Sequence, residues 1–89
     1  MKNWIDNVKW TDDGLVPVIV QDHISNKVIM FAWMNRLSLE ASLKQKKAIY
    51  WSRSRNKIWT KGESSGYYQY IKDMIIDCDK DVVLIKVKQ

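Results

Sequence analysis

The chain has 89 residues, a formal net charge of +5, five tryptophans and one cysteine. A chain of this length makes one small domain and buries only about 60–65% of its unfolded surface, so association with a second copy is a ready source of further stability. One cysteine cannot form an internal disulfide, and no apolar run approaches the length of a membrane span. These properties argue against a disulfide-stapled secreted module and against a membrane protein, and we expect a cytoplasmic location.

The first half of the sequence predicts a β-hairpin followed by one helix. Residues 15–20 and 28–33 are apolar and rich in β-branched side chains, and Ser25-Asn26 between them is a turn signal. Pro17 restricts the first strand to an edge of a sheet or to the start of a ladder. Asn35 is a good N-cap for a short helix whose leucines recur at a spacing of four.

The second half predicts mainly strands. Residues 48–55 alternate in a way that predicts a strand, and a short strand over 58–60 follows it. In that first strand one face would carry Trp51, Arg53 and Arg55. Residues 67–76 and 82–87 predict two further strands joined by an acidic turn. The expected fold class is α+β, a small sheet-rich single domain over residues 1–89 with one main helix.

A run of basic residues lies in the middle of the chain. From Lys44 to Lys61 every charged residue is basic, and Tyr50, Trp51 and Trp59 are interleaved with them. Positive charge beside aromatic rings favours a ligand that is anionic and has a flat ring, such as a nucleotide or a single nucleic-acid strand. The alternative is a basic face that is only solvated.

The loop from Lys61 to Gly66 contains two glycines around Ser64 and Ser65. Glycines let backbone N–H groups turn inward and form a concavity that binds anions, to which Lys61 would add charge. A hairpin loop of the same composition with no function is the alternative.

Three aspartates at alternate positions flank the only cysteine near the end of the chain, in the segment Asp77-Cys78-Asp79-Lys80-Asp81. In an extended strand the three carboxylates would project to one side and Cys78 to the other. Carboxylates suit a hard cation such as Mg²⁺ or Ca²⁺, and a thiolate suits the softer Zn²⁺. The alternative is an acidic β-turn that closes a hairpin, with Cys78 as a small apolar filler.

Taken together, four blocks of the sequence resemble the phosphoribosyl-AMP cyclohydrolases of histidine biosynthesis. The blocks occur in the family's order and with nearly its spacing, and they are Ala32-Trp33-Met34-Asn35, Tyr50-Trp51-Ser52-Arg53-Ser54-Arg55, Trp59 with Lys61-Gly62-Glu63-Ser64-Ser65-Gly66, and Asp77-Cys78-Asp79-Lys80-Asp81. The resemblance implies an enzyme that adds water at C6 of the adenine ring of phosphoribosyl-AMP and breaks the bond from C6 to N1. It also implies a homodimer with intertwined sheets and metal-dependent sites at the subunit boundary.

The resemblance also suggests roles for individual residues. Asp77, Asp79 and Asp81 match the family's Mg²⁺ ligands, and Cys78 matches the first of three zinc cysteines. The substrate-binding residues that we expect, most of them near the two phosphates, are Trp51, Arg53, Arg55, Lys61, Ser64 and Ser65.

The sequence departs from the family's pattern at two places. In the family the chain continues past the position of Gln89 with a Cys-His-Thr-Gly motif and a further cysteine, which supply two zinc ligands and a histidine suited to proton transfer. Tyr67 stands where the family often has histidine. We therefore identify no catalytic residue among these 89, and we expect them to be a truncated, inactive form of a complete cyclohydrolase.

Two other interpretations stay open at this point. One is a natural short homologue that binds nucleotide and Mg²⁺ without turnover. The other is a small nucleic-acid-binding β domain that uses Arg53, Arg55 and the aromatic rings as a stacking platform. The clustered aspartates argue against the latter, because carboxylates repel phosphate unless a cation intervenes.

Overall fold

The computed structural model describes residues 2–89, so Met1, with which the predicted domain starts, lies outside the described residues. A short 3-10 helix, Lys2–Asn7, precedes the regular elements. These are β1 (Leu15–Asp22), β2 (Val28–Asn35), α1 (Arg36–Gln45), β3 (Ile49–Ser52), β4 (Lys57–Thr60), β5 (Tyr70–Ile76) and β6 (Val83–Lys88). The expected α+β fold with one main helix is confirmed.

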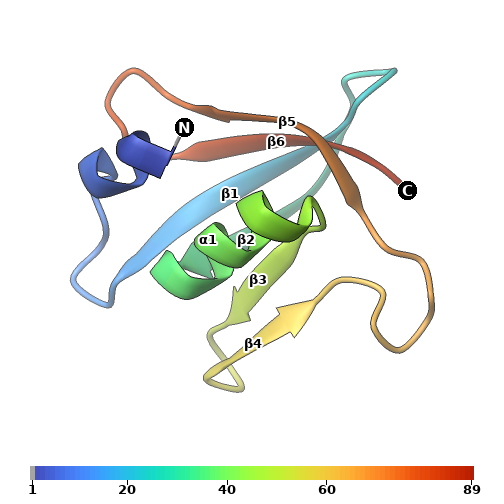
Figure 1. Ribbon diagram of the computed structural model, residues 1–89, viewed down its shortest axis with the longest axis horizontal. Coiled ribbons are helices and arrows are strands. Elements are labelled where there is room, and N and C mark those ends of the chain that lie inside the picture. The colour runs from blue at the N-terminus through green and yellow to red at the C-terminus, as the bar shows by residue number, and fades with distance from the viewer. Residues whose placement is uncertain (1) are drawn as a thin grey trace.

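The strands form two sheets. The larger has the order β2-β1-β6-β5, and β3 pairs with β4 in a separate two-stranded sheet. Figure 1 shows α1 in front of the large sheet and the β3–β4 pair below it. The predicted hairpins β1–β2 and β5–β6 are both present as antiparallel pairs. Strands β1 and β6, from opposite ends of the chain, pair in parallel at the centre of the large sheet.

Pro17 lies in a central strand, at the place where the second ladder has not yet begun. It is opposite Trp33 of β2, whereas pairing of β1 with β6 starts one residue later, at Val18. A proline cannot donate a ladder hydrogen bond, so it is tolerated at this position. Of the two positions predicted for it, the start of a ladder is the one observed.

Helix α1 begins where the sequence predicts. The Asn35 side chain accepts a hydrogen bond from the Ser38 N–H, and the Ser38 hydroxyl in turn accepts one from the Asn35 N–H, which completes a capping box. The helix ends at Lys46, which has a left-handed backbone with φ of 58°. Leu39 on its inner face is fully buried.

The hydrophobic core lies between α1 and one face of the large sheet. Every second residue of β1 and β6 enters it, and these residues are Val16, Val18, Val20, Val83, Ile85 and Val87, all fully buried. Tyr50 of β3 is buried beside them, and its hydroxyl donates to Gln69 Oε1 at 2.6 Å. Burial raises the pKa of Tyr50, because the charged phenolate would lose its solvation.

The opposite face of the large sheet carries a row of apolar side chains. The strand registers place Phe31, Ile19, Leu84 and Ile75 side by side across all four strands. Phe31 is 58% exposed and Ile75 is 42% exposed, and the two side chains between them are partly exposed. This uncovered row spans the width of the sheet and alternates with the buried core residues.

No helix in the described part of the chain is both long and apolar enough to cross a membrane.

Candidate functional site

The acidic segment forms a tight turn between β5 and β6, which we call the acidic turn (residues 77–82). Asp77 Oδ1 accepts hydrogen bonds from the N–H groups of Asp81 at 2.9 Å and Val82 at 3.1 Å. The backbones of Asp77 and Val82 are also bonded to each other, at 3.0 Å, and the Lys80 carbonyl accepts a bond from the Lys9 N–H at 2.8 Å. One carboxylate oxygen therefore organises the turn.

Of the two conformations considered from the sequence, the acidic turn that closes a hairpin is the one observed, and the extended one is wrong. Cys78 therefore does not point away from all of the aspartates. Instead, ligand atoms of Asp77, Cys78 and Asp79 lie within 4.8 Å of one another, and Asp81 is outside that group. The turn thus brings the thiol into the same cluster as two of the carboxylates.

Hydrogen bonding moves the pKa values of Asp77 and Asp81 in opposite directions. Partial desolvation raises the pKa of Asp77, but the backbone N–H groups of Asp81 and Val82 lower it, and the net pKa lies below its ordinary value. The Asp77 carboxylate raises the pKa of Asp81 through a side-chain hydrogen bond, and desolvation adds to this effect. The negative charges of Asp77 and Asp79 also raise the pKa of Asp81 by repulsion, and a cation at the turn would reduce that repulsion.

The basic residues lie on the other hairpin, which we call the basic hairpin (β3, β4 and the turn over residues 53–56). The expected strand over 48–55 is too long, because it ends at Ser52 and the next four residues form the turn. Asn56 in that turn has a left-handed φ of 52°. The expectation that Arg53 and Arg55 share a strand face with Trp51 is therefore wrong.

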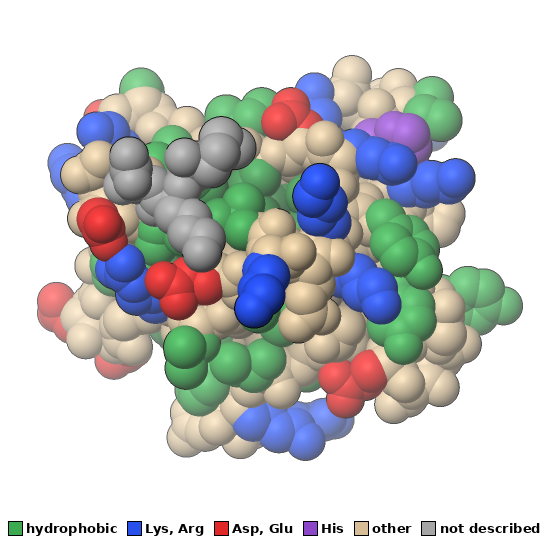
Figure 2. Space-filling view, viewed as in Figure 1, with side chains coloured by type: hydrophobic (Ala, Val, Ile, Leu, Met, Phe, Trp, Pro, Cys, Tyr) green, Lys and Arg blue, Asp and Glu red, His purple; other side chains and the backbone are tan. Residues whose placement is uncertain are grey.

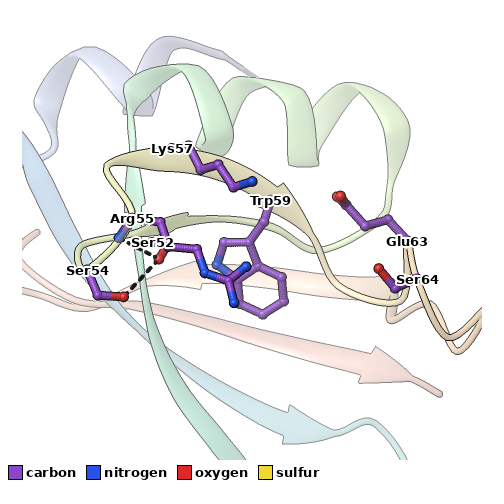
Figure 3. Close-up of a pocket in the computed structure, with 7 residues that line it drawn as sticks. All are labelled: Ser52, Ser54, Arg55, Lys57, Trp59, Glu63 and Ser64. Atoms are coloured by element: carbon purple, nitrogen blue, oxygen red, sulfur yellow. Dashed lines mark hydrogen bonds between the residues drawn. The ribbon is translucent and has the colours of Figure 1, made fainter.

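The two arginines contribute to different pockets. Arg55 lines a cavity of about 350 Å³, which we call the Arg55 pocket, together with Ser52, Ser54, Lys57, Trp59, Glu63 and Ser64. Figure 3 shows the Trp59 indole between the hairpin turn on one side and Glu63 with Ser64 on the other. The pocket therefore combines two cations, three hydroxyls, one carboxylate and an aromatic ring.

Four of the predicted substrate residues do not line this pocket. Trp51 and Arg53 line a second cavity with Asp13, Leu15 and Asn56. The Arg53 guanidinium lies over the Trp33 ring, 4.5 Å from its centroid.

Lys61 lines a third cavity with Tyr67 and Gln89, and the Ser65 hydroxyl accepts a hydrogen bond from the Tyr67 N–H at 3.2 Å. Of the six predicted residues, only Arg55 and Ser64 line the Arg55 pocket.

The loop from Lys61 to Gly66 depends on its first glycine. Gly62 has a φ of +93°, and a Cβ at this position would lie 2.5 Å from the Tyr67 carbonyl carbon and oxygen. Several N–H groups that were expected to turn inward are used within the structure, since Lys61 donates to Ala48 and Gly66 donates to Gly62. Backbone hydrogen bonds thus stabilise the loop, and its Ser64 side chain lines the Arg55 pocket.

The acidic turn and the basic hairpin lie far apart within one chain. Figure 1 shows the acidic turn at the upper left, beside the N-terminal helix, and the basic hairpin at the bottom of the molecule. In the same orientation, Figure 2 shows Lys and Arg side chains scattered over this face rather than gathered in one patch. The net positive charge is thus not concentrated on this face.

Comparison with known proteins identifies the family. The model of the family described as phosphoribosyl-AMP cyclohydrolase matches residues 30–89. A phosphoribosyl-AMP cyclohydrolase of Pseudomonas fluorescens is 55% identical over 89 residues, which are 100% of this chain and 67% of that protein. One from Chlorobium phaeovibrioides is 60% identical over 88 residues, covering 99% of this chain and 64% of that protein. The chain belongs to the phosphoribosyl-AMP cyclohydrolase family.

The chain spans about two thirds of the length of these cyclohydrolases, and another from Cellvibrio japonicus, 52% identical, is covered to 71%. Membership confirms the expected resemblance and argues against a nucleic-acid-binding β domain. It leaves the roles of the individual residues as predictions.

Five residues that line the Arg55 pocket of this cyclohydrolase chain were not named from the sequence as substrate-binding residues: Ser52, Ser54, Lys57, Trp59 and Glu63. Trp59 and the basic run that contains Lys57 were nevertheless expected to favour a nucleotide-like ligand. Part of the signal was available, since Lys57 and Trp59 are two residues apart in a strand and so share a face. The remaining part, the pairing of Ser52 with Lys57 across the hairpin, follows only from the observed register.

Proposed function

We propose that this chain provides the substrate-binding and Mg²⁺-binding parts of a phosphoribosyl-AMP cyclohydrolase, an enzyme of histidine biosynthesis. The observation that carries the proposal is the Arg55 pocket in a member of this family. Its two cations, Arg55 and Lys57, suit a phosphate group, and the Trp59 indole suits a flat heterocycle.

The reaction adds one water molecule and opens one ring. The oxygen of water bonds to C6 of the adenine ring, the bond from C6 to N1 breaks, and N1 takes up a proton. In this proposal Arg55 and Lys57 hold a phosphate, and the hydroxyls of Ser52 and Ser54 donate further hydrogen bonds to it. These contacts fix the nucleotide so that its ring lies against an aromatic wall.

The acidic turn fits a Mg²⁺ ion. Mg²⁺ in proteins is held by one or two carboxylates and keeps several waters. Asp77 and Asp79 provide two carboxylates whose oxygens lie within 4.8 Å of each other, and in this proposal each supplies one ligand. In this proposal Asp81, which was expected as a third ligand, contributes through coordinated water. Bound Mg²⁺ would supply positive charge beside the substrate's anionic groups.

The residues of this chain do not complete a catalytic zinc site. Such a site takes three protein ligands and leaves one position for water. Cys78 is free and exposed, and it is the chain's only cysteine. Cys78 fits as one zinc ligand, but the other two ligands are not among these residues. We therefore derive no step through zinc.

We also propose that the working form is a homodimer. The row formed by Phe31, Ile19, Leu84 and Ile75 is an apolar sheet face that none of the elements described here covers. Arg53 lies at the edge of this face through its contact with Trp33. Because the acidic turn and the Arg55 pocket are far apart in one chain, a site that uses both needs two chains.

The dimer proposal is tested by placing a charge in the uncovered row. Phe31→Lys should convert the protein to a monomer, because burying an unpaired ammonium in an apolar interface is strongly unfavourable. Leu37→Lys is the matched control, since Leu37 is 65% exposed but lies on α1. Sedimentation velocity measures the outcome, and a Phe31→Lys protein that remains a dimer would refute this interface.

The activity is tested by following ring opening of phosphoribosyl-AMP by absorbance, with added Mg²⁺ and Zn²⁺. A polypeptide of these 89 residues should show no measurable turnover, because it holds one of three zinc cysteines. The same polypeptide extended after Gln89 with the family's Cys-His-Thr-Gly segment and further cysteine should turn over. Cys78→Ser in the extended chain should abolish turnover, with Ser25→Ala as a control that leaves it unchanged.

Two results would contradict this account. Rapid turnover by the 89-residue polypeptide would show that the attacking water is activated by other ligands. No turnover by the extended chain, together with nucleotide and Mg²⁺ binding, would favour the second candidate, a binding homologue without activity. The observation that favours a binding homologue without activity is the single cysteine.

We expect a cytoplasmic location, since an exposed free cysteine such as Cys78 suits a reducing compartment.

A further inference from the structure

The Arg55 pocket has charges of opposite sign at its two ends. Arg55 and Ser54 come from the hairpin turn and Ser52 from the end of β3, whereas Glu63 and Ser64 come from the loop that follows β4. Figure 3 shows these two groups on either side of Trp59. An anion is attracted to the arginine end and repelled from the carboxylate end. A ligand that fills the whole pocket must therefore be anionic at one end only.

Glu63 has a structural contact that leaves part of its carboxylate free. Its Oε1 accepts a hydrogen bond from the Thr60 N–H at 2.7 Å, and its own N–H donates to the Thr60 carbonyl at 3.1 Å. An ionised carboxylate has about four acceptor sites and no donor. With one of these sites used by Thr60, the others remain available to groups in the pocket that donate hydrogen bonds.

We propose that Glu63 recognises the hydroxyl groups of a ribose whose phosphate is held by Arg55 and Lys57. Ribose hydroxyls are neutral donors, and they lie next to the phosphate in a phosphoribosyl group. A cationic ligand group would be repelled by Arg55 and Lys57 in the same cavity. Carboxylates select ribose in the same way in dinucleotide-binding folds, where an acidic side chain accepts from the 2′-hydroxyl.

This inference rests on the proposed function and refines it. A phosphoribosyl-AMP molecule has two phosphoribosyl groups, and the proposal assigns one of them to the Arg55 pocket with a defined direction. The phosphate lies toward the hairpin turn, and the sugar lies toward the Lys61–Gly66 loop. Glu63 is then a residue that determines specificity for a ribonucleotide over a deoxyribonucleotide.

The experiment compares AMP with 2′-deoxy-AMP, which differ by one hydroxyl. Binding of each is measured by nuclear magnetic resonance titration to the 89-residue protein. Wild type should bind AMP at least about fivefold more tightly, the value of one hydrogen bond at an exposed site. In Glu63→Gln this preference should fall by at least about half, because a charged acceptor is replaced by a neutral one. In Glu63→Ala it should disappear.

The variants separate recognition from folding. Gln at position 63 keeps an oxygen that can accept from the Thr60 N–H, so the loop contact is retained while the charge is lost. Lys57→Gln should weaken both nucleotides equally and leave the preference unchanged. Glu40→Gln on α1 should change neither affinity nor preference, since Glu40 bonds to Arg36 outside the pocket.

Three results would overturn the proposal. These are an equal affinity of wild type for the two nucleotides, no binding of either, and a full preference for AMP in Glu63→Gln and Glu63→Ala. Failure of the proposed activity is distinguishable from these results, because turnover of phosphoribosyl-AMP is measured separately with the extended chain. A normal nucleotide preference without turnover would leave the ribose assignment standing and remove the activity.

Discussion

The acidic turn and the basic hairpin are both charged connections between antiparallel strands, but they are built in different ways. The acidic turn takes its clustered side chains from consecutive residues and is fixed by the Asp77 carboxylate. It contains no glycine and tolerates a left-handed Lys80, with φ of 63°. The Arg55 pocket takes its side chains from two strands, a turn and a loop, and the loop depends on Gly62.

This difference determines how substitutions in each region affect stability and ligand affinity. In the acidic turn the same carboxylate supports the backbone and faces the proposed ion, so binding and local structure are coupled. In the Arg55 pocket the backbone is supported by glycine geometry and the ligand is contacted by other residues, so the two properties separate. Substitutions in the two regions should accordingly give different combinations of lost stability and lost affinity.

The largest effect on stability is expected in the loop from Lys61 to Gly66. Gly62→Ala should lower the free energy of unfolding by about 3 kcal/mol, because the new Cβ meets the Tyr67 backbone and alanine disfavours a positive φ. Gly66→Ala is the matched control, since Gly66 has a φ of +83° but a Cβ there would meet no atom within 4 Å. It should cost about 1 kcal/mol. Urea denaturation measures both, and equal losses would show that the close approach at Gly62 relaxes freely.

The next effect concerns the acidic turn alone. Asp79→Asn should weaken Mg²⁺ binding by roughly tenfold or more, since it removes one of two clustered carboxylates. It should leave stability almost unchanged, because the hydrogen bonds that fix the turn go to Asp77. Calorimetric titration of Mg²⁺ provides the measurement, with Asp12→Asn as a control at an exposed carboxyl outside the turn. Equal Mg²⁺ affinity in wild type and Asp79→Asn would remove the turn from the metal role.

The smallest effect separates the two arginines of the basic hairpin. Arg55→Lys should weaken AMP binding by about three- to tenfold, because an ammonium cannot make the bidentate contacts of a guanidinium. Arg53→Lys should affect AMP less, since Arg53 lies over Trp33 and lines a different cavity. The two affinities are compared by nuclear magnetic resonance titration. A greater loss for Arg53→Lys would instead support the expectation from the sequence that Arg53 binds phosphate.

Local patterns in the sequence predicted most of the secondary structure. The β1–β2 hairpin, the Asn35 cap of α1 and the β5–β6 hairpin all follow from residues close together in the chain. The parallel pairing of β1 with β6 does not, because it joins opposite ends of the chain and no local signal specifies it. The same limit explains why the separation of the acidic turn from the basic hairpin was not foreseen.

The error at residues 53–56 has a local cause. Alternating serine and arginine fit a strand pattern, but none of these side chains has an apolar face to bury, so nothing holds the segment extended. Asn56 accepts the left-handed conformation that a tight hairpin turn requires. In the acidic segment the sequence allowed both an extended strand and a turn, and the turn forms because the Asp77 side chain bonds the backbone of the residues that follow it.

The parallel β1–β6 pair also has a consequence for how the chain folds as it is synthesised. Val18 pairs with Val83, so the middle of the large sheet stays open until the 64 residues between them have also been synthesised. The β1–β2 hairpin can form early, but one edge of β1 stays unpaired until β6 is available. The parallel pairing of β1 with β6 joins distant residues and is therefore intrinsically slow. Docking of β6 then fills the sheet and closes the acidic turn in the same step. Among the strands described here, β6 is therefore the one whose pairing completes both the core and the proposed ion site.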